Sequence, residues 1–115
     1  ATTYTEEDLT KLKEFSQCLA DNGVKAYGAG WCGYCKKLKE TFGGDATTGA
    51  DVISPFYLEC QNADRSATEH AGTCTEEEIK GFPTIKLDGE SSSLSALSSL
   101  DDFAAATGCD APVLS

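Results

Sequence analysis

The chain has 115 residues, which fits one compact domain (1–115) and leaves no room for two. No apolar run approaches the roughly 20 residues of a membrane-spanning helix, so direct insertion into a membrane is not expected. Nine Lys and Arg residues against 19 Asp and Glu give a net charge of −10, which argues against nucleic acid as a partner because phosphates bind basic faces.

The first half of the chain alternates helix and strand signals. Thr5, followed three residues later by Asp8, is typical of a helix N-cap, and apolar side chains then recur at helical spacing. A polar, glycine-rich stretch later in this half indicates a loop. The predicted elements are a helix ending at Asn22-Gly23, a strand at 24–28, a helix at 31–42 and a loop at 43–51.

The second half continues the alternation. Thr75 and Ser99 each precede an acidic residue at the third position of a predicted helix, and Asp88-Gly89 indicates a hairpin turn. The predicted elements are a strand at 56–58, an irregular segment at 61–73, a helix from Thr75 to Gly81, strands at 84–87 and 91–97, and a helix from Ser99 closed by Gly108. The order α-β-α-β-α-β-(β)-α predicts an α/β fold with a central sheet of three or four strands flanked by helices.

Cysteine is abundant for a chain of this size. An even number of cysteines in a small chain suits a disulfide framework in an oxidising, non-cytosolic compartment. The six are Cys18, Cys32, Cys35, Cys60, Cys74 and Cys109. Because the chain opens with polar residues, we expect that a targeting segment has been removed or that the chain is a piece of a longer protein.

The motif Trp31-Cys32-Gly33-Tyr34-Cys35 carries the predicted chemistry. It follows a predicted strand and opens a predicted helix, a context in which two cysteines three apart form a redox pair. Unpaired N–H groups at the helix start, together with Lys36, favour a thiolate at Cys32. A structural disulfide and half of a zinc site are the alternatives, although His70 is the only histidine. We expect no metal and no organic cofactor.

A second motif, Gly81-Phe82-Pro83-Thr84, precedes the strand predicted at 84–87. Proline cannot donate a hydrogen bond within a sheet, so Pro83 is expected at the strand start. An ordinary turn proline would produce the same tetrapeptide.

With these two motifs, nearly the whole chain resembles the thioredoxin superfamily, including protein disulfide isomerase domains at WCGYCKKLK and GFPTIK. A closer resemblance is to the thioredoxin-like domain fused to bacterial and plant vitamin K epoxide reductase homologues. The matching features are the opening helix, VKAYGAGWCGYCKKLKETFG, YLEC, CTEEEIKGFPT and SLDDFAAATG.

The resemblance implies a thioredoxin-like fold with a mixed sheet and assigns roles to the motif residues. Cys32 would be the exposed attacking thiol, Cys35 the buried resolving thiol and Pro83 a cis-proline facing them. A substrate groove would be shaped by Trp31, Gly33, Tyr34 and Phe82, although Trp31 and Tyr34 could equally pack around the site.

One departure from thioredoxins concerns the proton of the buried thiol. Thioredoxins keep a buried Asp six residues before the first cysteine, and that position is Ala26 here. The Lys that pairs with this Asp is replaced around Phe56. Proton transfer must therefore use water or another group, which suits an oxidase or an electron relay better than a fast reductase.

The remaining cysteines have structural interpretations. The resemblance implies a disulfide between Cys60 and Cys74, which would tether the loop between them, and two buried free thiols are the alternative. Cys18 and Cys109 would pair only if the two ends of the chain pack side by side, and they are otherwise independent thiols.

These observations predict a thiol–disulfide oxidoreductase that acts on protein thiols or disulfides. The resemblance implies a role in oxidative folding or as a relay to a membrane-embedded, vitamin K epoxide reductase-like oxidase. The resemblance implies a soluble domain in the thylakoid lumen, the periplasm or the secretory pathway. A disulfide isomerase is one alternative. The other is a non-catalytic binding module in which Cys32 and Cys35 form a structural disulfide.

Overall fold

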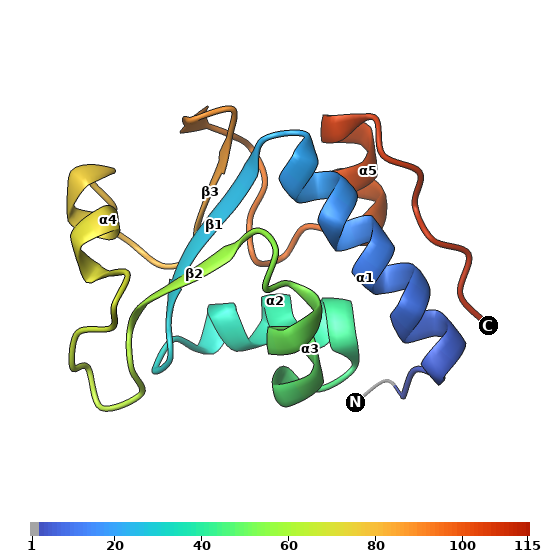
Figure 1. Cartoon of the computed structure of the whole chain (residues 1–115), viewed down its shortest axis with the longest axis horizontal. Helices are drawn as coiled ribbons and strands as arrows, with labels where there is room; N and C mark the ends of the chain where they lie inside the picture. Colours follow the sequence, from blue (N-terminus) through green and yellow to red (C-terminus); the bar gives the residue numbers. More distant parts are fainter. Residues whose placement is uncertain (1–2) are drawn as a thin grey trace.

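The computed structural model describes residues 3–115, so residues 1 and 2 of the predicted domain lie outside the described residues. Within that range, four strands form one mixed sheet in the order β2-β1-β3-β4 (Figure 1). β1 is parallel to β2 and antiparallel to β3, and β3 is antiparallel to β4. The strands are β1 (Val24–Ala29), β2 (Tyr57–Gln61), β3 (Thr84–Leu87) and β4 (Glu90–Ser91).

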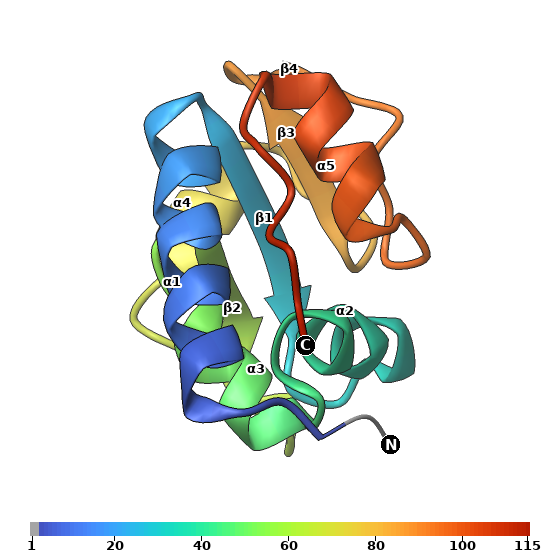
Figure 2. The same cartoon turned by 90° about the vertical axis from the view of Figure 1, so that its right-hand side faces the viewer.

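Helices flank the sheet on both faces, as the sequence predicts. Figure 2 shows α1 and α4 to one side of the strands, with α2 and α5 to the other. Capping boxes at Thr5 and Ser99 start α1 and α5, and Gly108, with a φ of +80°, ends α5. The helices are α1 (Glu6–Asp21), α2 (Gly33–Gly43), α3 (Ala46–Val52), α4 (Ala71–Glu76) and α5 (Leu100–Thr107).

The prediction of a loop at 43–51 is wrong, because α3 forms there. Asp45 caps this helix by accepting a hydrogen bond from the Thr48 amide at 2.7 Å. Two glycines allow α2 and α3 to pack closely. A Cβ atom on Gly49 of α3 would collide with the Lys39 carbonyl oxygen, and a Cβ atom on Gly43, the last residue of α2, would collide with the Gly49 backbone. The glycine-rich composition of this segment is typical of a flexible loop. In the structure, the glycines instead allow two helices to pack closely.

The helix predicted from Thr75 to Gly81 lies earlier, at Ala71–Glu76. The chain leaves the helix because Glu78 takes a left-handed φ of +57° and the Ile79 amide donates to the Cys74 carbonyl. Thr75 is therefore inside the helix, where its hydroxyl donates to the Ala71 carbonyl.

The prediction of an edge strand at 91–97 is also wrong, because the strand lies earlier in the chain and is shorter. β4 is only Glu90–Ser91 and follows directly on the Asp88-Gly89 turn. The ladder stops there because the hydroxyl of Ser92, rather than a further strand residue, donates to the Ile85 carbonyl.

The main core lies between the sheet and α1, α2 and α5, where Phe42 packs against Phe15, Phe56 and Phe103. The C-terminal segment runs along α1 in Figures 1 and 2, and the Ser115 amide donates to the Asp8 carboxylate at 3.0 Å. The two ends of the chain therefore lie together, and the core holds β1 with its C-terminal end directed at the start of α2.

Candidate redox site

Cys32 is the N-cap residue of α2, three residues after the end of β1. Its sulfur accepts a hydrogen bond from the Cys35 amide at 3.3 Å. Its thiol donates to the carbonyl oxygen of Phe82 at 3.5 Å. A sulfur at a helix N-cap lies against unpaired N–H groups, which stabilise a negative charge there.

Cys32 and Cys35 are free thiols that differ in burial. Cys35 has no exposed surface, and Cys32 retains 9%. The expectation of an exposed Cys32 is therefore wrong, because Phe82 and Ala29 pack around both thiols. Burial, with a further contribution from the hydrogen bond to the Cys32 sulfur, raises the pKa of Cys35 to about 12. Cys35 is therefore protonated at neutral pH.

Phe82 and Pro83 lie directly before β3 and close one side of the thiol pair. The peptide bond between them is cis. Phe82 contacts two apolar clusters, one around Cys32 and Cys35 and the other around Cys60 and Cys74. This single side chain connects the free thiols to a neighbouring disulfide.

Trp31 forms the rim on the other side of Cys32 and is 39% exposed. Its indole N–H donates to the Gln61 side chain at 2.7 Å, and its ring packs edge-on against Phe82. The guanidinium of Arg65 lies 4.1 Å from the ring centroid. Trp31 is therefore fixed by three contacts while one part of its ring stays open to solvent.

Gly33 and Tyr34 lie on the solvent side of the first turn of α2. Tyr34 is 55% exposed. No atom lies within 4 Å of the position that a Cβ atom on Gly33 would occupy. Gly33 borders the same cavity as Cys32, and Tyr34 is open to solvent beside it in the sequence.

The other four cysteines form two disulfides in this structure. Cys60 in β2 is joined to Cys74 in α4, with 6.0 Å between their Cα atoms. Cys18 near the end of α1 is joined to Cys109 after α5, with 6.1 Å between Cα atoms. Neither bond involves the thiols at the start of α2.

A polar group that sequence reasoning missed lies behind Cys35. The Tyr57 hydroxyl donates to Glu59 Oε1 at 2.6 Å, and Glu59 Oε2 lies 3.0 Å from the Lys39 ammonium. Burial raises the pKa of Tyr57, and the hydrogen bond to Glu59 raises it further. Two sequence spacings could have revealed the group: Cys35 and Lys39 are four apart on a helix, and Tyr57 and Glu59 are two apart on a strand.

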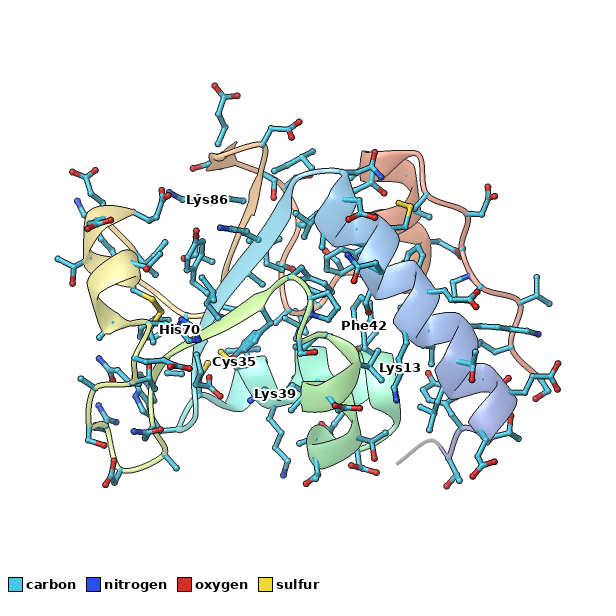
Figure 3. The ribbon with its side chains drawn as sticks, viewed as in Figure 1. Lys13, Cys35, Lys39, Phe42, His70 and Lys86 are labelled. Carbon is cyan, nitrogen blue, oxygen red and sulfur yellow. A yellow bond between two sulfur atoms is a disulfide. The ribbon has the colours of Figure 1, made fainter. Side chains whose placement is uncertain are left out.

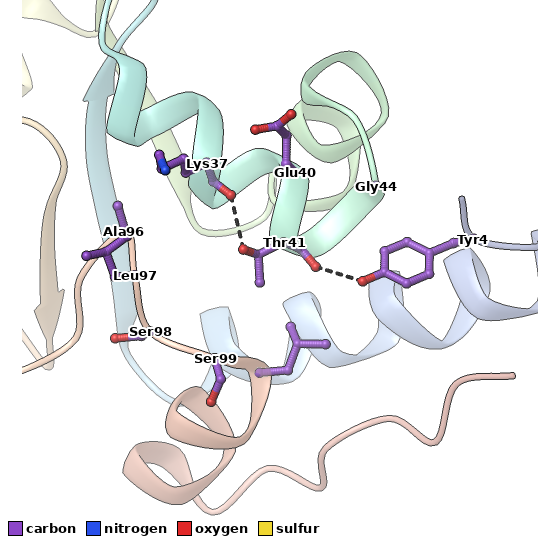
Figure 4. Close-up of a pocket in the computed structure, with 10 residues that line it drawn as sticks. Tyr4, Lys37, Glu40, Thr41, Gly44, Ala96, Leu97, Ser98 and Ser99 are labelled. Carbon is purple, nitrogen blue, oxygen red and sulfur yellow. Dashed lines mark hydrogen bonds between the residues drawn. The ribbon is translucent and has the colours of Figure 1, made fainter. Parts of the chain in front are cut away.

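Three of the cavities bear on the thiol pair or contrast with it. The remote cavity, of about 600 Å³, lies between Tyr4, the end of α2 and residues 96–100 and contains no cysteine (Figure 4). A cavity of about 560 Å³ borders Lys39, Tyr57 and Glu59, and one of about 210 Å³ borders Cys32 and Lys36. The last two give the thiol pair and its polar neighbours access to solvent.

Within the described residues 3–115, no three His, Cys, Asp or Glu side chains gather as possible metal ligands. No helix formed by these residues has the length and apolar character needed to cross a membrane.

The strand–CxxC–helix arrangement beside the Phe82–Pro83 bond agrees with the comparison to protein families. The thioredoxin family model matches residues 8–104 of this chain. The chain belongs to the thioredoxin family. This match covers every strand and the helix that carries the free thiols.

Three relatives indicate the range of the family to which the chain is similar. It is 38% identical over 73 residues to a mitochondrial thioredoxin domain-containing protein of Schizosaccharomyces pombe, covering 64% of this chain and 19% of the relative. It is 36% identical over 63 residues to a thiol-disulfide oxidoreductase of Arabidopsis thaliana, covering 54% and 15%. It is 32% identical over 66 residues to protein disulfide-isomerase A3 of Gallus gallus, covering 56% and 12%. The chain thus spans less than one fifth of the length of each of these relatives.

Proposed function

We propose that this chain is a thiol–disulfide oxidoreductase in which Cys32 and Cys35 exchange disulfides with protein substrates. The observation that carries the proposal is the pair of free thiols at the start of α2, one completely buried and the other at the surface edge, beside a cis Phe82–Pro83 bond. The relatives named thiol-disulfide oxidoreductase and protein disulfide-isomerase support it.

The reaction proceeds through a mixed disulfide on Cys32. To reduce a substrate, the Cys32 thiolate attacks one sulfur of the substrate disulfide, and the other sulfur leaves as a thiolate. Cys35 then loses its proton and attacks the Cys32 sulfur, which forms the Cys32–Cys35 disulfide and releases the second substrate thiolate. Two electrons pass from the chain to the substrate. In the oxidising direction the same steps run in reverse.

The burial of the two thiols supports this order of events. Cys32 is buried but retains 9% exposure and borders the cavity of about 210 Å³, whereas Cys35 has no exposed surface, so Cys32 is the thiol nearer to an approaching substrate sulfur. Trp31 and Phe82 flank Cys32, and Tyr34 and Gly33 leave its front open. We propose that an extended segment of a protein substrate lies against these residues.

We also propose an oxidising, non-cytosolic compartment, which is the thylakoid lumen, the periplasm or the secretory pathway. Two disulfides outside the site support this assignment because reducing compartments rarely retain such bonds. The proposed electron acceptor or donor is a membrane-embedded oxidase similar to vitamin K epoxide reductase. The sequence resemblance supports that partner, together with Ala26 at the position where reductases of the family keep a buried acid.

Single-cysteine variants test the proposed function. Cys35→Ser should accumulate a mixed disulfide with a peptide substrate on Cys32, because the resolving thiol is absent. Cys32→Ser should form none, because Cys35 is buried. Mass spectrometry of the adducts under non-reducing conditions provides the measurement. Trapping on Cys35 alone would reverse the assignment, and no trapping in either variant would favour a non-catalytic binding module.

A second comparison separates oxidase from isomerase activity. An oxidase or relay should transfer its disulfide to a reduced protein faster than it rearranges the bonds of a scrambled one. The relatives named protein disulfide-isomerase make the isomerase the second candidate. Faster rearrangement than net oxidation would favour that candidate over the relay.

A further inference from the structure

We infer that Tyr57 and Glu59 carry the proton away from Cys35, with the Glu59 carboxylate as its acceptor. The inference rests on the proposed function, since only a resolving thiol must lose a proton in every turnover. Cys35 is completely buried and protonated, and Ala26 offers no acid at the family's usual position. The proton therefore needs a route through neighbouring side chains.

The first contact of the route joins Cys35 to Tyr57. Gly28 in β1 lies between them and has no side chain. A Cβ atom there would collide with the Tyr57 hydroxyl and would lie 2.9 Å from the Cys35 sulfur, so both groups border the same space. Against the burial that raises it, the Tyr57 side chain lowers the pKa of Cys35, and Cys35 in turn adds to the rise in the pKa of Tyr57.

The second contact is the hydrogen bond from Tyr57 to Glu59. The single proton of the Tyr57 hydroxyl is donated to Glu59 Oε1 at 2.6 Å, a length typical of a bond to a carboxylate. The oxygen of Tyr57 is therefore left as an acceptor for the Cys35 thiol proton. The sulfur, the hydroxyl and the carboxylate therefore lie in succession, with the hydroxyl between the other two.

The route ends at solvent. The Glu59 side chain is 31% exposed, and with Tyr57 it borders the cavity of about 560 Å³. The charged and titratable groups facing this space are Lys39 of α2, Glu59 of β2, and Glu69 and His70 before α4. Figure 3 labels Cys35 and Lys39 on α2 and His70 on the segment that leads to α4.

Lys39 holds the Glu59 carboxylate in place. Its ammonium lies 3.0 Å from Glu59 Oε2 and 5.1 Å from the centre of the Tyr57 ring, and its side chain is only 13% exposed. This ion pair orients the Glu59 carboxylate so that its other oxygen accepts the hydrogen bond from Tyr57. Lys39 is therefore a positioning residue for the route.

The proton and electron changes of the resolving step balance. The Cys35 thiol proton passes to the Tyr57 oxygen while the Tyr57 proton passes to Glu59, which becomes a neutral acid and then loses the proton to water in the cavity. The freed electron pair of Cys35 attacks the Cys32 sulfur. The Cys32–substrate bond breaks, and its electron pair leaves on the substrate sulfur.

Two variants test the route in single turnovers with 5,5′-dithiobis(2-nitrobenzoate). Attack by Cys32 on this reagent releases one coloured thiolate, and resolution by Cys35 releases a second. Because this leaving group needs no proton, the second phase reports deprotonation of Cys35. Tyr57→Phe removes only the hydroxyl, and Glu59→Gln removes only the ability to accept the proton. Tyr27→Phe changes a buried tyrosine of β1 outside the route and is the matched control.

Both variants should slow the second phase about 100- to 10,000-fold at pH 6–7, the range for loss of a general base. The first phase should change less than about twofold, since the route does not include Cys32, and Tyr27→Phe should alter neither phase. The slow phase should recover as pH rises, because hydroxide replaces the missing acceptor. This recovery would not follow from a structural role alone.

Glu59→Gln gives the sharper result because two explanations predict opposite signs. If Glu59 acted only through its negative charge, its removal would ease formation of the Cys35 thiolate and speed the second phase. A faster or unchanged second phase in Glu59→Gln, or an unchanged one in Tyr57→Phe, would overturn the inference. Absence of a second phase in the unaltered protein would instead contradict the proposed function.

Discussion

At the scale of single residues, the chemistry depends on the unequal surroundings of two thiols. Cys32 accepts a backbone hydrogen bond at the start of a helix, whereas Cys35 lies one turn further in, without exposed surface. Cys32 is therefore the thiol that a substrate reaches first, and Cys35 stays protonated until a mixed disulfide has formed on Cys32. Such a separation gives the exchange its order.

A labelling experiment on the fully reduced Cys32–Cys35 pair tests this inequality. Iodoacetamide near pH 8 should modify Cys32 and spare Cys35, because a buried thiol with a pKa of about 12 is almost entirely protonated there. Peptide mass mapping identifies the modified residue. Equal labelling of both thiols in the folded protein would contradict the unequal pair.

The sequence identifies the reacting residues better than their surroundings. Cys32, Cys35, Phe82 and Pro83 stand in short motifs whose spacing can be recognised. The burial of Cys32 could not be predicted, because Phe82 covers it from 50 residues away in the sequence. Tyr57 and its partners escaped notice for the same reason: a polar group assembled from a helix and a strand has no contiguous motif.

At the scale of elements, α2 is held in place by α3. The contact is close because Gly49 packs directly on the backbone of α2 at Lys39, the residue that pairs with Glu59. A segment whose composition resembles a loop therefore fixes the helix that carries both thiols. Local propensity misidentified this segment, because Asp45 capping and contact with α2 outweigh the cost of glycine in a helix.

Gly49→Ala tests the packing of α3 on α2. The added methyl group would collide with the Lys39 carbonyl, so the variant should lose about 1–3 kcal/mol of unfolding free energy, as overpacked sites do. Gly72→Ala is the matched control, since Gly72 lies in helix α4 with no atom within 4 Å of its missing Cβ atom. That control should be neutral or slightly stabilising. Urea unfolding measures both, and equal stability of the two variants would contradict the close packing.

At the scale of the whole molecule, the first helix, the last helix and the C-terminal segment close over the core. The Cys18–Cys109 disulfide joins α1 to the end of α5, and Asp8 receives hydrogen bonds from Ser115. The helix–strand order and the caps of α1 and α5 could be predicted because their signals are local. This pairing of the two ends required the tertiary structure.

The Asp8 contact predicts a pH dependence of stability. The backbone hydrogen bond from Ser115 is the largest cause that lowers the pKa of Asp8 below its ordinary value of 3.8. A group with a lowered folded pKa stabilises the fold above its unfolded pKa and loses that effect as pH falls through the folded value. Asp8→Asn should therefore reduce stability at pH 6, and its difference from the unaltered protein should shrink below about pH 4. Urea unfolding across this range measures it, and a difference independent of pH would contradict the assignment.

The central claim is that Cys32 and Cys35 form a reversible redox couple while the other cysteines hold the fold. Its most direct test is a redox titration in glutathione buffers, followed by acid quenching, alkylation and a count of free thiols by mass. We predict a two-electron transition at Cys32 and Cys35 between about −120 and −270 mV, the range of thioredoxin-fold oxidoreductases. Cys18–Cys109 and Cys60–Cys74 should stay oxidised throughout. Reduction of Cys60–Cys74 before any change at Cys32 and Cys35, or failure of those two thiols to form a disulfide, would contradict the account.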